Sequence, residues 1–206
     1  MSAIRLLVLG AVRQHGRAHG YTVRNDLEFW GAHRWSNAKP GSIYHALKQM
    51  AKQGLLHAHE TAPSDAGGPP RTEYELTAGG EAEFGRLLRY ALTDIDAKPD
   101  MLTSGVGFLV DLPRNEAIAL LRQRISALEE WRAEVAAHWS PQDGAEEESW
   151  GHIGEIMKLW VHEAESGAEW ARGLVARLED GAYVMAGEGE RGKNVLPPEE
   201  MGEPTP

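Results

Sequence analysis

The stretch Pro40-Gly41-Ser42-Ile43-Tyr44-His45-Ala46-Leu47 decides the fold of this chain, because it opens a helix with one apolar and one polar face. Proline is favoured in the first turn of a helix, and Gly54 supplies the expected stop. Ile43, Leu47 and Met50 recur at helical spacing and form the apolar face. The polar face carries Ser42, Tyr44, His45, Lys48, Gln49 and Lys52.

Two shorter helices are predicted before this one. The first spans Ser2 to Gln14, where apolar residues recur every three or four positions, and the second spans Tyr21 to Glu28. Gly16 and Gly20 separate them. The third helix therefore follows two others, as it does in helix-turn-helix proteins.

A hairpin and a fourth helix are predicted after Gly54. Leu55–Thr61 and Thr72–Leu76 alternate as strands do, and the proline- and glycine-rich residues 63–70 form their connection. Thr77 can cap a helix that continues to about Thr93, although three glycines weaken its start. Three helices, a hairpin and a fourth helix describe a winged helix-turn-helix, whose third helix enters the major groove of DNA.

The remainder of the chain is predicted to be helical. A boundary at Asp94–Pro99 precedes an apolar segment at 101–112, and two long helices follow over Asn115–Trp139 and Ser149–Asp180. We expect a fold that is mainly α with a small β-hairpin, in which an N-terminal winged helix-turn-helix precedes a C-terminal antiparallel helical dimerisation domain. The expected units are a DNA-binding domain at 1–93, a helical dimerisation and effector domain at 94–180, and a largely disordered tail at 181–206.

The last helix carries an apolar stripe that is typical of helix–helix packing. A helix of about 30 residues is roughly 45 Å long, more than a small domain needs, so we expect the stripe to meet a partner helix in a homodimer. The residues expected at the dimer interface are Trp150, Ile153, Met157, Trp160, Ala164 and Leu174.

Charge is distributed unevenly along the chain. The net charge is −10, but residues 1–59 hold eight Lys and Arg against Asp26 and Glu28, which gives 8 − 2 = +6 and leaves −16 for the rest. A basic module joined to an acidic remainder favours a polyanionic partner for the first part, because the local field matters more than the total.

Several classes of protein are disfavoured. The absence of cysteine excludes disulfides and thiolate chemistry and is compatible with a cytoplasmic location. The apolar run near the N-terminus is too short for a membrane span, so no membrane partner is expected. No phosphate-binding glycine loop, nucleophile elbow or His-Glu-x-x-His motif occurs, so we expect neither an enzyme nor a cofactor.

Five segments together resemble the PadR family of transcriptional regulators. They are Leu6-Leu7-Val8-Leu9, His19-Gly20-Tyr21, the stretch from Pro40 to Leu47, Gly54-Leu55-Leu56 and the run from Arg71 to Gly80. The resemblance covers roughly the first 90 residues, and the long C-terminal part resembles that of the family's larger subgroup. Met50-Ala51 departs from the Leu-Glu that relatives commonly carry there.

This resemblance implies a dimeric regulator that usually represses its own or an adjacent gene and leaves DNA when a small molecule or stress signal arrives. It implies DNA contacts for Tyr21, Ser42, Tyr44, Lys48 and Arg71. The chemistry of the third helix adds Lys39 and His45, because cations and donors near a helix N-terminus suit phosphates and base edges. The expected partner is a palindromic operator in double-stranded DNA.

Alternatives remain for some of these residues. The ring of Tyr44 could pack on the first helix instead of reaching DNA. Five tryptophans could stack on an aromatic effector or simply form core, and Trp131, Trp139 and Trp160 are the favoured effector pocket; the other two are Trp150 and Trp170.

The histidine pairs suggest a metal only weakly. His15 with His19, and His57 with His59, lack a third ligand nearby in sequence, so no metal site is expected. A protein-interaction adaptor that uses the winged scaffold without an operator is the alternative function.

Overall fold

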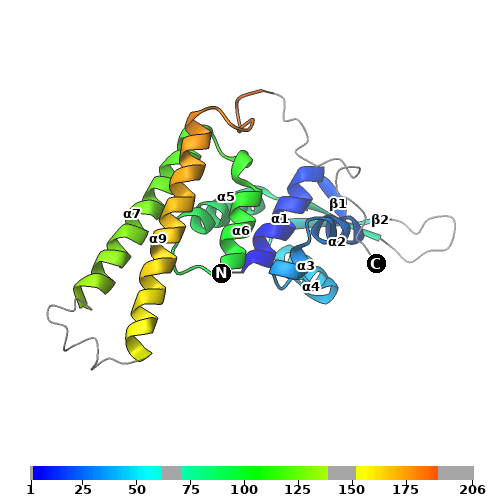
Figure 1. Cartoon of the computed structure of the whole chain (residues 1–206). Helices are drawn as coiled ribbons and strands as arrows, with labels where there is room; N and C mark the ends of the chain where they lie inside the picture. Colours follow the sequence, from blue (N-terminus) through cyan, green and yellow to red (C-terminus); the bar gives the residue numbers. More distant parts are fainter. Residues whose placement is uncertain (1, 62–70, 139–151, 190–206) are drawn as a thin grey trace, which may run out of the picture.

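The computed structural model describes residues 2–61, 71–138 and 152–189. It is mainly helical, with one small antiparallel sheet, as the sequence predicts. Figure 1 shows the helices up to α6 gathered with the sheet, and the long helices α7 and α9 side by side next to them. The elements are α1 (Ala3–His15), β1 (Arg17–His19), α2 (Gly20–Phe29), α3 (Ala32–Trp35), α4 (Pro40–Lys52), β2 (Leu56–Thr61), β3 (Arg71–Leu76), α5 (Ala78–Thr93), α6 (Pro99–Gly107), the 3₁₀ turn η1 (Leu109–Asp111), α7 (Arg114–His138) and α9 (His152–Glu179).

The hairpin β2–β3 gains a third strand that the sequence reading missed. β1 pairs antiparallel with β3 on the side opposite β2, so that Ala18 and Ala58 both lie opposite Tyr74. Gly16, with a φ of +70°, makes the turn from α1 into this strand. A strand of three residues is too short to show a period-two pattern in the sequence. The sequence therefore indicated only a break between two helices, at Gly16 and Gly20.

Helix α1 is the centre of the core. Leu6, Leu7, Val8 and Leu9 are consecutive and all buried, so α1 is covered on every side. It contacts α2, α4, α5, α6 and β3. The apolar run near the N-terminus is therefore a core helix, as expected, and no described helix is long and apolar enough to cross a membrane.

The start of α5 shows why its glycines are there. The hydroxyl of Thr77 accepts a hydrogen bond from the amide of Gly80 at 3.0 Å, which confirms the predicted cap. A Cβ on Gly80 would lie 2.1 Å from the carbonyl oxygen of Leu55. Gly80 thus permits a close approach of α5 to the chain entering the hairpin, a benefit that helix propensity alone does not reveal.

Helix α6 is joined to α1 by an aromatic ring. The Phe108 ring is buried between Trp30 and Phe84, with edge-on contacts to both, and it lies over Gly10 of α1. Arg13 of α1 adds an ion pair to Asp111 of η1 at 2.7 Å. One continuous core therefore runs from α1 across the expected boundary at 94–99 into α7 and α9.

Helices α7 and α9 run antiparallel. Arg122 pairs with Glu179, Glu129 with Arg172, and Arg132 with Glu165. Residue numbers therefore rise along α7 as they fall along α9. Between them Leu128 packs against Ala164 and Ala168. The partner of much of the predicted apolar stripe is thus a helix of the same chain.

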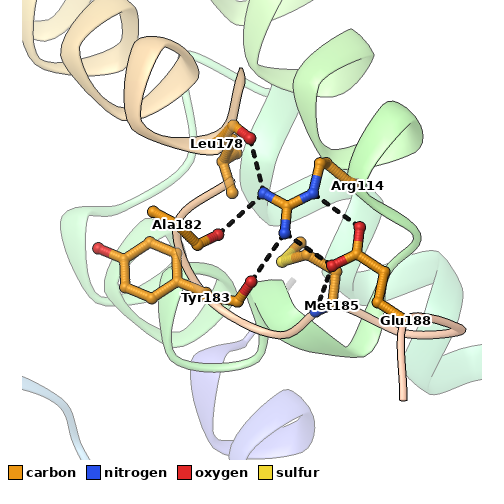
Figure 2. Close-up of polar contacts among 6 residues, drawn as sticks. All are labelled: Arg114, Leu178, Ala182, Tyr183, Met185 and Glu188. Atoms are coloured by element: carbon orange, nitrogen blue, oxygen red, sulfur yellow. Dashed lines mark hydrogen bonds and ion pairs between the residues drawn. The ribbon is translucent and has the colours of Figure 1, made fainter. Parts of the chain in front are cut away.

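The residues after α9 correct part of the predicted disordered tail. Figure 2 shows the Arg114 guanidinium donating to the carbonyl oxygens of Leu178, Ala182 and Tyr183 and to the Glu188 carboxylate, at distances of 2.6–2.9 Å. Met185 is fully buried in the main core. Residues 181–189 are therefore folded against α7, because one arginine binds the Leu178 carbonyl in the last turn of α9 and the Ala182 and Tyr183 carbonyls just after it. Residues 190–206 lie outside the described part of the chain.

Candidate nucleic-acid interface

Helix α4 has the two faces that its sequence predicts. Ile43, Leu47 and Met50 are buried against the core, while Tyr44, His45 and Lys48 are exposed. Lys39 and Lys52 are exposed at the two ends of the helix. The polar surface of α4 is therefore open to a partner, with a cation at each end.

Ser42 forms the start of this helix. Its hydroxyl accepts from the amide of Lys39 at 3.0 Å and lies 2.8 Å from the carbonyl oxygens of Asn37 and Lys39. These contacts close a first turn that would otherwise leave polar groups unpaired. Ser42 was predicted as a DNA contact, and the structure places it as a residue that fixes the position of the helix N-terminus.

Tyr44 is partly packed and partly open. Its ring lies against Gly20, where an added Cβ would be 2.7 Å from Cε1, yet 38% of the residue remains exposed. Burial raises the pKa of the neighbouring Tyr74, and Tyr44 adds to the effect. The ring thus packs on Gly20 at the start of α2 and not on the first helix, and a DNA contact by its exposed part stays a prediction.

Tyr21 lies at the start of α2, next to the three-stranded sheet. Its ring stacks on His19 of β1, with centroids 5.4 Å apart, and His19 lies 3.3 Å from Glu73 of β3. Arg71, the remaining predicted contact, is the first residue of β3 and lies opposite Thr61. The third strand thus connects Tyr21 to the same hairpin that carries Arg71.

The basic residues of the N-terminal module fall into two groups. Arg5, Arg13, Arg17 and Arg24 each form an ion pair with a carboxylate of the same chain. Within the described residues, four other cations form no ion pair, and they are Arg34, Lys39, Lys48 and Lys52.

These unpaired cations lie on or beside α3 and α4. No carboxylate in the described part of the chain pairs with them, so the positive field of the module is concentrated around the exposed face of α4. Arg34 belongs to this group although the sequence reading gave it no role. Its place beside α4 could not be predicted, because four residues are too few for the helix α3 to be recognised in the sequence.

Residues 8–86 match the model of the transcriptional regulator PadR-like family. This part of the chain is therefore similar to the PadR-like family. The match covers α4, the sheet and most of α5, the parts that form the surface described above. No curated protein matches the sequence.

Solved structures with a similar arrangement include PadR proteins. Bacillus subtilis PadR in complex with operator DNA is 20% identical, with 84% of this chain and 98% of that chain covered and a TM-score of 0.36. The PadR-like regulator BC1756 from Bacillus cereus is 19% identical, with 86% and 99% covered and a TM-score of 0.35. B. subtilis PadR in complex with p-coumaric acid is 17% identical, with 86% and 96% covered and a TM-score of 0.33. At these values the likeness carries no functional argument for this chain.

The residues predicted at the dimer interface separate into two sets. Ala164 and Leu174 are 3% and 4% exposed within a single chain, so they belong to its core and correct that part of the prediction. Ile153 and Trp160 are exposed, Met157 is half-buried, and Trp150 lies outside the described residues. The open residues all lie toward the N-terminus of α9, beyond the PadR-like domain.

The exposed surface on α9 is larger than predicted. Ile156 and Leu159 are exposed beside Ile153 and Trp160, and Leu159 reaches 53%. Trp131 of α7 adjoins them, because its ring lies 6.0 Å from that of Trp160. We call Trp131, Ile153, Ile156, Leu159 and Trp160 the apolar strip.

The predicted effector residues are only partly brought together. Trp131 and Trp160 are in contact, but each is 38% exposed, and Trp139 lies outside the described residues. None of these tryptophans lines the cavity of about 410 Å³ in the described part of the chain. That cavity lies elsewhere, between α1 and α6.

Three of the four histidines in the predicted pairs, His15, His19 and His59, lie against carboxylates. His15 lies 2.7 Å from Asp26, and His59 lies 3.0 Å from Glu75, which also accepts from Arg17. These contacts lower the pKa of Glu75, with the Arg17 hydrogen bond as the largest cause. Within residues 2–61, 71–138 and 152–189, no group of three or more His, Asp or Glu side chains could hold a metal ion.

Proposed function

We propose that this protein is a homodimeric transcriptional regulator that binds a palindromic operator through α4 and represses the gene it controls until a small molecule or stress signal releases it. The observation that carries the proposal is the exposed face of α4, with the unpaired cations around it, in a PadR-like domain. We place the protein in the cytoplasm, where its DNA would be.

The roles of individual residues follow from chemistry. Lys39 and Lys48 neutralise phosphates, and the α4 N-terminus adds its dipole to that attraction. Tyr44 and His45 face base edges in the major groove, where donors and acceptors differ between base pairs. Tyr21 and Arg71 reach the backbone beside the groove. Ser42 supports this set by holding the helix start in place.

The apolar strip supports the dimer. Monomers rarely leave several large apolar side chains exposed together, because their burial gains about 25 cal/mol per Å². A two-fold axis through this surface would bring two copies of α4 to one face of DNA, about 34 Å apart for successive major grooves.

Control by a small molecule is the other half of the proposal. B. subtilis PadR has been solved with operator DNA and with p-coumaric acid, so that protein binds both kinds of partner. Its structural likeness to this chain carries no argument, and we propose the same kind of control here because residues 8–86 match the PadR-like family.

The test is a fluorescence anisotropy titration of the duplex upstream of the protein's own gene, repeated at several salt concentrations. We expect a complex at low salt whose log affinity falls linearly with log salt concentration, because each neutralised phosphate releases counterions. A titration without a complex at the lowest salt would remove the proposal's main support.

A protein-interaction adaptor is the second candidate. The acidic remainder of −16 and the exposed apolar strip favour contacts between proteins. A pull-down from cells followed by sequencing and mass spectrometry separates the two functions. Enrichment of one DNA site supports the regulator, while protein partners without an enriched site support the adaptor.

A further inference from the structure

The three-stranded sheet has an outer face that carries an ordered set of ionisable side chains. On its inner face Tyr74 is buried and lies opposite Ala18 and Ala58. Side chains alternate along a strand, so the residues on either side of these three point outward. They form three columns, which are Arg17 and His19 on β1, Glu73 and Glu75 on β3, and His57 and His59 on β2. We call these six residues the outer sheet face.

The carboxylates of the central column lie between basic groups on both sides. The Oε2 atom of Glu75 accepts a hydrogen bond from Arg17 at 2.9 Å, and Nε2 of His59 lies 3.0 Å from the same oxygen. The rings of His57 and His59 are 6.2 Å apart on β2, which is an edge strand of the sheet. The sign of the charge on this surface therefore depends on whether these histidines carry a proton.

His19 differs from the other two histidines. Its Nε2 lies 3.3 Å from Glu73, and its ring stacks on Tyr21. Its Nδ1 is buried and has no hydrogen-bond partner in the part of the chain that the structure describes. A proton on this atom would leave a buried donor unpaired, which is unfavourable. We therefore assign the change of charge to His57 and His59.

The charge of the outer sheet face changes sign when these two histidines gain protons. With neutral histidines the face holds one arginine and two glutamates, which gives 1 − 2 = −1, and two protons change this to −1 + 2 = +1. Histidine side chains ordinarily gain their charge between about pH 8 and pH 5. Glu75 stays ionised over this range, because Arg17, the largest cause, and His59 lower its pKa.

The outer sheet face lies beside residues for which we propose DNA contacts. Tyr21 stacks on His19, and Arg71 is the first residue of β3. Helix α4 also contacts β2, and its exposed ionisable side chains include His45, Lys48 and Lys52. Charges within about 10 Å of one another interact at 0.1 M salt, so the sign of this face acts on the phosphates that its neighbours contact.

We propose that the outer sheet face is a conditional phosphate-binding surface, which repels the DNA backbone when His57 and His59 are neutral and attracts it when they are protonated. DNA binding is accordingly stronger at acid pH. The inference rests on the proposed function, because it concerns the same DNA that α4 is proposed to bind.

Fluorescence anisotropy tests the proposal with a duplex that the protein selects from a random pool. We expect Kd of the unmodified protein to be at least about tenfold lower at about pH 5.5 than at about pH 8. The salt slope should be larger by about one to two units at the lower pH, because each newly neutralised phosphate releases counterions. In the double variant His57→Gln with His59→Gln, the ratio of the two Kd values should be at least about fivefold smaller. His45 is present in both proteins, so the comparison isolates the two strand histidines.

Two further variants separate the effect of charge from other effects. The double variant His57→Lys with His59→Lys carries both charges at either pH, so at about pH 8 it should bind as tightly as the unmodified protein does at about pH 5.5. His162→Gln removes an exposed histidine of α9 and should leave the ratio of Kd values unchanged. Circular dichroism at both pH values checks that each variant is folded.

The possible outcomes distinguish this inference from the proposed function. Equal ratios in the unmodified protein and the double glutamine variant would overturn the conditional surface while the proposed function stands. A double lysine variant that binds at about pH 8 no more tightly than the unmodified protein would do the same. If no duplex is bound at either pH, the proposed function is itself refuted, and the conditional surface with it.

Discussion

Gly10 of α1 lacks a side chain, and this lets the Phe108 ring at the end of α6 pack directly on α1. The Phe108 ring lies where a Cβ on Gly10 would be, at 2.2 Å from its nearest carbon, and the ring is held from the other sides by Trp30 and Phe84. A glycine in the middle of α1 weakens the helix by about 1 kcal/mol. The contact with Phe108 offsets this cost, so the reason for the glycine lies in tertiary packing that the sequence does not display.

Gly10→Ala is therefore expected to destabilise the protein although alanine favours helices. The buried ring cannot move aside, and overpacking of this kind costs roughly 1–3 kcal/mol. Urea unfolding measures the change. Gly107→Ala is the control, because its Cβ meets nothing within 4 Å, and we expect it to change stability by less than about 1 kcal/mol. A Gly10→Ala protein as stable as the original would contradict the packing described here.

Lys48 is expected to contact one phosphate. Replacing it with alanine should lower the affinity for all DNA sequences and reduce the salt slope by about one unit. Arg122→Ala also removes an exposed cation, but one that lies on α7 and pairs with Glu179 of α9, and it should leave the slope unchanged. Identical slopes for Lys48→Ala and the unmodified protein would remove Lys48 from the interface.

At the scale of elements, periodicity predicted the long helices and the hairpin, and it failed where an element is short or is held by a distant residue. Helix α4 was predictable because its apolar face repeats over three turns. β1 and α3 contain too few residues to show a period. The candidate site was predicted in part. The exposed face of α4 follows from the sequence, but the place of Arg34 beside it and the ion pairs of the other arginines could be seen only in the tertiary structure.

The segment 181–189 is the clearest element that composition could not predict. Its glycines and small residues are typical of disorder, yet Arg114, far away in sequence, binds its carbonyls and Glu188 (Figure 2). The Arg114 hydrogen bond is the largest cause that lowers the pKa of Glu188 below its ordinary value of 4.5. A group with a lowered pKa stabilises the fold above its ordinary pKa and loses that effect as the pH falls.

Glu188→Gln is accordingly expected to be less stable than the unmodified protein at pH 7. The gap should close as the pH falls below about 4.5 and through the lower pKa of the folded state, where Glu188 becomes protonated in both states. Thermal unfolding across this range measures it, with Glu163→Gln, an exposed carboxylate of α9, as the control. A gap that stays constant with pH would show that the Arg114 pair does not hold this segment.

At the scale of the whole molecule, the exposed face of α4, which we propose binds DNA, and the apolar strip lie on different helices. Figure 1 shows α4 among the helices near the sheet, and α7 and α9 extending beside them. The core is continuous from α1 to α9, so a displacement at one end has a packed path to the other. Dimerisation through the strip would thus fix the spacing of the two α4 helices.

Leu159→Asp is expected to yield a folded monomer. Leu159 is the most exposed residue of the strip, so the change should spare the core of the chain but bury a charge in the dimer. Light scattering gives the mass, and circular dichroism confirms the fold. Ala176→Asp adds the same charge to an exposed position farther along α9 and should remain dimeric. A dimeric Leu159→Asp protein would move the interface elsewhere.

The most direct test of the central claim is a footprint on DNA that the protein selects from a random duplex pool. A dimer that reads DNA through α4 predicts an inverted repeat with two protected half-sites whose centres are about 34 Å, or one helical turn, apart. It also predicts that Lys48→Ala weakens both half-sites equally. Recovery of no enriched sequence, or of a single unrepeated site that Lys48→Ala leaves unchanged, would contradict the account.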